Sequence, residues 1–327
     1  MTAATGVGSM PGDDIDEAMR IVAGELPEFL HLPELPARGA GASMTGRGVA
    51  IIGELGFDLQ PAGWRLTGAA GADQLRARSL LDRDLDALEI HALGYEGPLK
   101  LQVIGPWTLA ATVERPRGDR LLADFGARRE LAQALAEGVA AQVAVVAKRV
   151  PGASIVLQLD EPALPAVLAG RVPTASGFHR HRSVDLPLAD EALRWVLDAA
   201  REAGATTLVH CCADEPPIAL FRGAGADGVS VDLARLSAGA LDALGEVLDS
   251  GGSAHLGVVP AVPTGAPPSE RAAIETVRRT CDMLGFDPGE LSDRLVLTPA
   301  CGLAGASPSY AREALRVVRT AARSLVE

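Results

Sequence analysis

Short β-rich apolar runs recur eight times along this chain, and amphipathic segments separate them. Each run ends in Gly, Pro or polar residues, as a strand does before a turn. Several runs, such as Ile155-Val156-Leu157, are apolar on both faces, which is expected of a strand covered on both sides. The predicted strands cover residues 5–10, 30–35, 99–107, 154–160, 207–212, 228–233, 254–259 and 294–299.

Apolar residues three to four positions apart predict helices between these strands. The predicted helices cover residues 13–26, 120–150, 190–204, 238–250, 269–284 and 309–326. This alternation indicates a parallel sheet, and eight units fit a closed barrel better than an open sheet. We therefore predict an α/β fold, a single (β/α)8 TIM barrel over residues 1–327, with loops and short helices in the less regular stretch 39–98.

Composition and charge exclude several classes of protein. Hydrophobic residues make up 48% of the chain, but uninterrupted apolar runs fall short of the roughly 20 residues that span a membrane. The first seven residues lack the basic and apolar regions of a secretory signal. A net charge of -12 without a basic tract argues against nucleic acids and anionic membranes as partners. We predict a cytoplasmic protein.

Four cysteines, Cys211, Cys212, Cys281 and Cys301, are the strongest chemical signal in the chain. A chain of this size in a reducing compartment does not need disulfides, so metal binding or catalysis is the preferred interpretation. Cys281 lies within a predicted helix, which indicates a core residue. Alternation along the strand ending at residue 212 sends Cys211 away from the side that Cys212 faces, so a structural role is expected for Cys211 as well.

His210 shares the side of that strand with Cys212, and Cys301 ends the last strand. Active-site groups of a β/α barrel lie at the carboxyl ends of its strands, where these three side chains could meet. Zinc favours such nitrogen and sulfur ligands. Asp232, at the end of another strand, could occupy a fourth position.

Five ordered segments resemble the C-terminal catalytic barrel of the cobalamin-independent methionine synthase family. They span most of the chain, and the candidate zinc ligands are among them. The segments are Gly6-Val7-Gly8-Ser9-Met10-Pro11, Ile104-Gly105-Pro106-Trp107-Thr108, Leu157-Gln158-Leu159-Asp160-Glu161-Pro162-Ala163-Leu164, Val209-His210-Cys211-Cys212 and Thr298-Pro299-Ala300-Cys301-Gly302-Leu303.

The resemblance implies a zinc ion on His210, Cys212, Asp232 and Cys301, with Asp232 at the position where the family usually has Glu. The zinc would convert the thiol of homocysteine into a methyl-accepting thiolate, and the product would be methionine. The resemblance thus implies an S-methyltransferase of the short form, without the second barrel of the long enzymes.

The resemblance also implies anchors for the amino-acid part of the substrate. They map to Gly8, Ser9 and Asp160, and an ionised Asp160 would pair with an ammonium group. Glu34 is the nearest candidate by barrel position for a further family Glu that holds the amino group. Trp107 is expected either to form an apolar wall of the pocket or to pack in the core.

The methyl donor is left open between a folate and a methylcorrinoid supplied by another protein. The family's long members place a His in the loop after strand seven, and residues 257–265 contain none. Because a folate amine leaves poorly without an acid, the corrinoid is preferred. Two other interpretations remain: zinc-dependent alkyl transfer to another small thiol, and a barrel that binds zinc or a thiol without catalysis.

Overall fold

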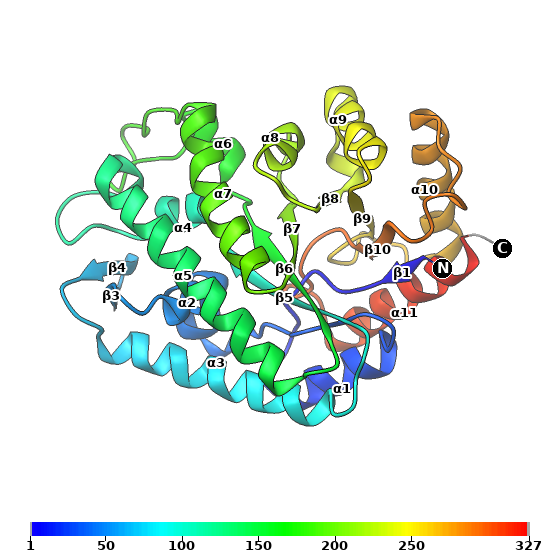
Figure 1. Ribbon diagram of the computed structural model, residues 1–327, viewed down its shortest axis with the longest axis horizontal. Coiled ribbons are helices and arrows are strands. Elements are labelled where there is room, and N and C mark those ends of the chain that lie inside the picture. The colour runs from blue at the N-terminus through cyan, green and yellow to red at the C-terminus, as the bar shows by residue number, and fades with distance from the viewer. Residues whose placement is uncertain (1, 326–327) are drawn as a thin grey trace.

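The computed structural model describes residues 2–325, and parallel strands form its centre (Figure 1). In these residues the order within the main sheet is β1-β10-β9-β8-β7-β6-β5-β2, and every neighbouring pair is parallel. The strands are β1 (Ala3–Ala4), β2 (Leu30–His31), β5 (Pro98–Ile104), β6 (Ser154–Asp160), β7 (Thr206–Cys211), β8 (Gly228–Asp232), β9 (Ser253–Val259) and β10 (Leu295–Pro299).

The sheet closes between its two edge strands, just beyond their assigned ends. Ser9 and Glu34 form a parallel bridge. Met10 N–H donates to the Glu34 carbonyl at 2.8 Å, and Glu34 N–H donates to the Gly8 carbonyl at 3.1 Å. The predicted (β/α)8 barrel is therefore confirmed. The first strand is shorter and earlier than predicted, and the segment 5–10 joins the barrel mainly through this bridge.

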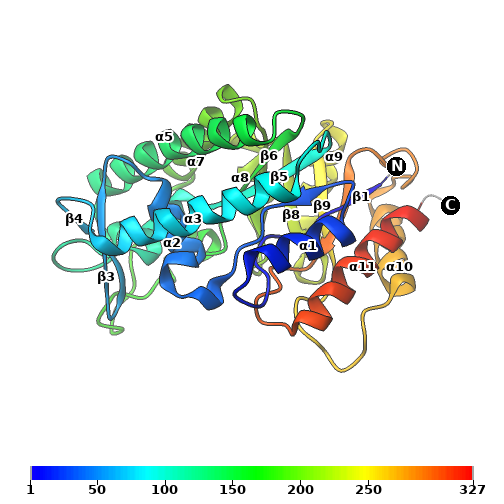
Figure 2. The same ribbon diagram turned by 90° about the horizontal axis from the view of Figure 1, so that it is seen from below.

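Helices cover the outside of the barrel, and Figure 2 shows α1, α11 and α10 side by side over one part of it. Every predicted helix overlaps an observed one, although residue 326 of the last prediction lies outside the described residues. The helices are α1 (Ile15–Glu25), α2 (Met44–Ile51), α3 (Ala72–His91), α4 (Pro106–Thr112), α5 (Phe125–Arg149), α6 (Leu164–Leu168), α7 (Leu186–Glu202), α8 (Ile218–Gly223), α9 (Ala238–Asp249), α10 (Glu270–Leu284) and α11 (Pro308–Ser324).

The prediction of loops and short helices for residues 39–98 is wrong in two respects. The region contains the 20-residue helix α3 and an antiparallel hairpin of β3 (Gly56–Gln60) and β4 (Gly63–Thr67). The buried face of α3 includes Gln74 and Asp84. Gln74 donates to three backbone carbonyls and Asp84 pairs with two arginines, so these polar residues interrupt the apolar spacing that would have revealed the helix.

Helix α5 is, by length and composition, the one helix among residues 2–325 that could cross a membrane. Half of its most apolar stretch is buried, and it packs against α7 on the outside of the barrel. A core helix of a globular protein passes the same test, so this helix is weak support for a membrane span.

Candidate metal centre

The carboxyl ends of β7 and β10 bring three of the predicted metal ligands together. The ligand atoms of His210, Cys212 and Cys301 all lie within 4.8 Å of one another. Cys301 Sγ is 3.9 Å from His210 Nε2. Cys211, between the two ligands on β7, is instead fully buried in the apolar core, so the strand alternation acts as the sequence predicts. This group can hold a metal ion through one imidazole and two sulfur atoms.

The two sulfurs of the group share their protons unequally. A hydrogen bond from Cys212, assisted by one from His210, lowers the pKa of the Cys301 thiol. The same hydrogen bond to Cys301, with burial, raises the pKa of Cys212. Cys301 is therefore the sulfur that loses its proton more readily, and a metal ion binding both sulfurs would displace the proton of Cys212.

Ser230 on β8 orients the imidazole of this group, a contact that the sequence did not predict. Its Oγ lies 3.0 Å from His210 Nδ1, which leaves Nε2 facing Cys301. Partners of this kind fix the ring orientation of a metal-binding histidine. The sequence did contain a signal for this contact. Residues two positions apart on a strand share a face, and Ser230 is two positions before Asp232, which was a predicted ligand.

Asp232, the fourth predicted ligand, lies outside the group of three, and its place as a ligand stays a prediction. Its Oδ1 accepts from the Ala234 N–H at 3.0 Å, and its Oδ2 lies 3.3 Å from Arg235 Nε. The carboxylate thus caps the short 3₁₀ helix η4 (Leu233–Arg235). Local hydrogen bonds hold the side chain because Asp is short enough to reach the backbone two residues ahead.

Asp160 is at the end of β6, where its backbone is in register with His210 of β7. The side chain is buried and accepts from Gln158 Nε2 at 2.7 Å. Burial raises the pKa of Asp160 to about 6, against the influence of His210 and the hydrogen bond from Gln158. A carboxylate in this position would gain from a cationic partner, as the predicted role in holding an ammonium group requires.

Gly8 and Ser9 connect the metal group to the opposite side of the barrel. The Ser9 carbonyl accepts from the Leu303 N–H at 2.7 Å, two residues after Cys301. A Cβ atom on Gly302 would lie 2.1 Å from Ser9 Oγ, so this close approach requires glycine. On its other side the Gly8–Ser9 segment pairs with Glu34. The segment is therefore placed where a bound substrate could reach both it and the metal group.

Glu34 is buried beside this segment in an ion-pair network. Arg47 Nε lies 3.2 Å from Glu34 Oε1, and Arg47 also pairs with Asp84. Burial raises the pKa of Glu34 to about 7, outweighing the opposite effect of Arg47. The charge of Asp160 contributes to the rise.

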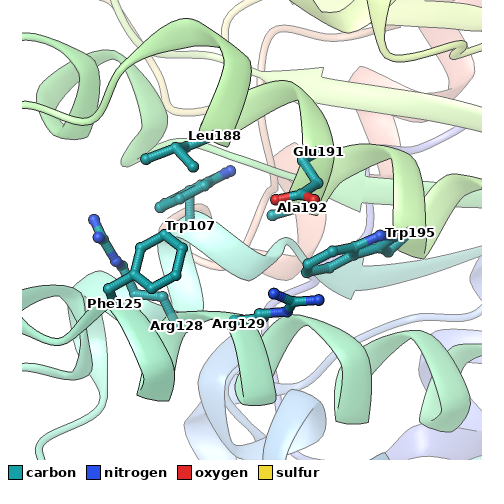
Figure 3. A pocket seen from close by; sticks show the side chains of 8 residues that line it. All are labelled: Trp107, Phe125, Arg128, Arg129, Leu188, Glu191, Ala192 and Trp195. Atoms are coloured by element: carbon teal, nitrogen blue, oxygen red, sulfur yellow. The ribbon is translucent and has the colours of Figure 1, made fainter.

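Trp107 lies in the helix layer and not at a strand end, which corrects its predicted place. It belongs to α4, and its Nε1–H donates to the Ala189 carbonyl of α7 at 3.1 Å. Figure 3 shows its indole beside Phe125 and Leu188 in a small hollow between α5 and α7. Of the two roles considered for Trp107, this position favours packing.

Glu161, which directly follows Asp160, has a structural role. It accepts from the N–H groups of Trp107 and Thr108, both at 2.9 Å, and from Thr108 Oγ1 at 2.7 Å. These are donors at the start of α4, so Glu161 caps that helix. A Cβ atom on Gly105 would lie 2.3 Å from Glu161 Oε1, and glycine is therefore needed there.

Three further histidines could in principle deliver a proton. His181 is buried, and its Nε2 lies 3.0 Å from Asp119 Oδ1. His179, two residues earlier, is exposed. His255 lies near the start of β9, away from the carboxyl end of that strand, and its ring packs edge-on against Phe29.

Comparison with known proteins agrees with this geometry. No match was found among curated proteins. Among solved structures, the B12-independent methionine synthase of Shewanella sp. W3-18-1 with selenomethionine is 12% identical, over 99% of this chain and 97% of that chain, with a TM-score of 0.61. The D-psicose 3-epimerase of Clostridium cellulolyticum H10 is 11% identical over 99% of each chain, with a TM-score of 0.49.

Identities this low show the fold alone. A family described as the cobalamin-independent synthase catalytic domain matches residues 111–324, more than half of the chain. That range contains Asp160 and the whole metal group. The chain therefore belongs to the cobalamin-independent synthase family, a family of methyltransferases.

Proposed function

We propose that this chain is a zinc-dependent S-methyltransferase that converts homocysteine into methionine. The observation that carries the proposal is the group of His210, Cys212 and Cys301 at the carboxyl end of the barrel in a member of this family. We propose further that residues 1–327 act as one catalytic domain in the cytoplasm.

The donor set fits zinc. One imidazole nitrogen and two sulfurs are ligands that zinc prefers, and three protein ligands leave a position for substrate. Cys301 is already inclined to be a thiolate. Zinc bound there would supply one thing, a lowered pKa for the thiol of an incoming substrate.

The residues around this group would position the acceptor. Asp160 would pair with its ammonium group, and the Gly8–Ser9 segment would contact the rest of its amino-acid part. Glu34, whose pKa responds to the charge of Asp160, would be a second carboxyl group for the same ammonium group. In the reaction a sulfur–carbon bond forms as the bond from the methyl carbon to the donor breaks, and the electron pair of that bond leaves with the donor.

The donor that best suits this site is a methylcorrinoid delivered by another protein. A folate amine needs an acid placed beside it as it leaves. The loop after β9 contains no His, and His181 is bound to Asp119. We therefore expect methyl transfer from methylcobalamin to exceed transfer from methyltetrahydrofolate.

The deciding experiment is zinc analysis of wild-type protein and Cys301→Ser, followed by X-ray absorption with and without homocysteine. We expect about one zinc per chain, lost in Cys301→Ser and kept in the control Cys281→Ser, whose thiol lies in α10. Homocysteine should add one sulfur to the zinc shell. Methionine formation is then measured with each donor.

Absence of zinc from reconstituted wild-type protein would refute the metal and the mechanism together. Zinc that gains no sulfur from homocysteine, but does so from another small thiol, would redirect the proposal to that acceptor. Zinc that binds no thiol at all would identify a barrel that only holds metal.

A further inference from the structure

Lys100 is completely buried in the centre of the barrel, on β5. Its Nζ donates to the Val7 carbonyl at 2.6 Å and to Gln158 Oε1 at 2.7 Å. Among residues 2–325, no carboxylate lies within ion-pair distance of it. Its two hydrogen-bond acceptors are therefore neutral. Burial lowers the pKa of Lys100 to about 7, and the charges of Asp160 and Glu34 oppose this effect.

Burial of this group is costly, so packing does not explain it. A buried ammonium loses its hydration, and apolar side chains of similar volume often serve stability as well or better. The chain has only two lysines, Lys100 and Lys148, against many arginines. A compact ammonium on a flexible stem is thus used here where the rest of the molecule uses the planar guanidinium.

The contacts of Lys100 lead to both proposed substrate anchors. Val7 directly precedes the Gly8–Ser9 segment. Gln158 links Lys100 to Asp160, because its Nε2 donates to Asp160 Oδ1 at 2.7 Å and to the Val7 carbonyl at 3.0 Å. Lys100 and Gln158 together therefore connect the segment that follows β1 with the end of β6.

Lys100 also supplies the donor that the Gln158 amide oxygen needs. The NH₂ group of the amide already points to two acceptors, Asp160 Oδ1 and the Val7 carbonyl. Without Lys100 the buried amide oxygen would lose its donor, and the cost of an unpaired buried acceptor would favour a shift of the amide. Such a shift would weaken the hydrogen bond that holds Asp160.

We propose that Lys100 is a positioning residue for the acceptor, which fixes the Gln158 amide and thereby holds Asp160 and the Gly8–Ser9 segment in their receptive arrangement. This inference rests on the proposed function, because it concerns how the same site recognises the amino-acid part of its thiol. Lys100 acts through these residues and does not touch the substrate.

The test compares two thiols on the protein loaded with Co²⁺, whose sulfur-to-metal absorption reports thiol binding. Homocysteine carries the amino and carboxyl groups, and propanethiol carries neither. Wild type should prefer homocysteine. Lys100→Met should lose at least about tenfold of this preference, the loss expected for one hydrogen bond to a charged group. Its affinity for propanethiol and its melting temperature should not fall.

Lys148→Met is the matched control, because Lys148 is exposed at the end of α5. It should behave as wild type. Gln158→Met provides a second route to the same result if Lys100→Met folds poorly. Because both residues act in one chain of hydrogen bonds, the double variant should lose no more preference than the worse single variant.

The outcomes separate the inference from the proposed function. Retention of the wild-type preference by both Lys100→Met and Gln158→Met would overturn the inference and leave the function intact. Equal weakening of both thiols with a lower melting temperature would also overturn it, since that is the result of a purely structural role. A wild-type protein that binds neither thiol would contradict the function, and the inference with it.

Discussion

The two sides of the barrel mouth present different chemistry. On one side, which we call the metal side, β7 and β10 supply His210, Cys212 and Cys301. On the other, which we call the anchor side, Asp160 ends β6, and Glu34 and the Gly8–Ser9 segment close the barrel. Lys100 of β5 supports this side from the centre of the barrel. One side offers soft, polarisable ligands and the other offers full charges.

The difference extends to how each side meets solvent. Cys212 and Cys301 are only partly buried, whereas Lys100 and Asp160 are almost entirely covered. A metal group must leave a position open to substrate, but an anchor gains strength where water is excluded. Under the proposed function, thiol activation and amino-acid recognition would therefore belong to separate strands, and each could be removed without the other.

The largest effect is expected from the adjacent pair Cys212 and Cys211. Cys212→Ser should remove a ligand and lower activity by more than about 100-fold, the upper range for losing only an outer partner of a metal ligand. Cys211→Ser should keep the metal but lose stability, because its hydroxyl would be buried without a designed partner. Metal content and activity are measured for both variants. Loss of metal from Cys211→Ser would contradict the conclusion that Cys212, and not Cys211, faces the metal group.

A second pair tests the anchor side. Asp160→Asn should keep full metal content yet bind homocysteine about 10 to 100-fold less tightly, the range for losing a hydrogen bond to a charged group. Propanethiol binding should not change. Glu161→Gln, in the next position, should instead loosen α4 and lower the melting temperature. Isothermal titration with both thiols distinguishes these effects. Weaker propanethiol binding by Asp160→Asn would show that the metal side and the anchor side do not act separately.

The third prediction concerns pH and Glu34. Its pKa is raised by burial from 4.5 to about 7, so between these values the folded protein holds a proton that the unfolded chain has released. Stability attributable to Glu34 is therefore full below pH 4.5, falls as pH rises to 7 and is constant above that. The total loss is at most about 3 kcal/mol.

Glu34→Gln removes this dependence. Relative to wild type, the variant should therefore gain stability between pH 4.5 and pH 8. Urea unfolding of both proteins across that range measures the difference. A constant difference would mean that Arg47 keeps Glu34 ionised throughout, contrary to the expected dominance of burial.

The smallest effect is expected on the metal side at Ser230. Ser230→Ala should lower metal affinity by about tenfold, the lower end of the range for outer-shell partners, because His210 loses the contact at Nδ1. Competition with a chelator measures this affinity. Unchanged affinity would show that the barrel alone orients the imidazole.

Much of the fold was predictable because its signals are local. Strand runs such as residues 154–160 and the His210-x-Cys212 spacing depend on the alternation of neighbouring residues, which any strand imposes. The barrel rule then placed Cys301 at the same end without knowledge of distances. The region 39–98 escaped prediction because α3 buries Gln74 and Asp84, whose partners lie far away in sequence.

The sequence alone was enough to predict the eight barrel strands, the long helices outside residues 39–98 and the meeting of His210, Cys212 and Cys301. The folded structure was needed to show that Asp232 caps η4, that Trp107 packs between helices and that Lys100 contacts Gln158 and the Val7 carbonyl. The reason is physical. Periodicity fixes which face a side chain takes, but the partner of a buried polar or charged group is chosen by segments that only folding brings together.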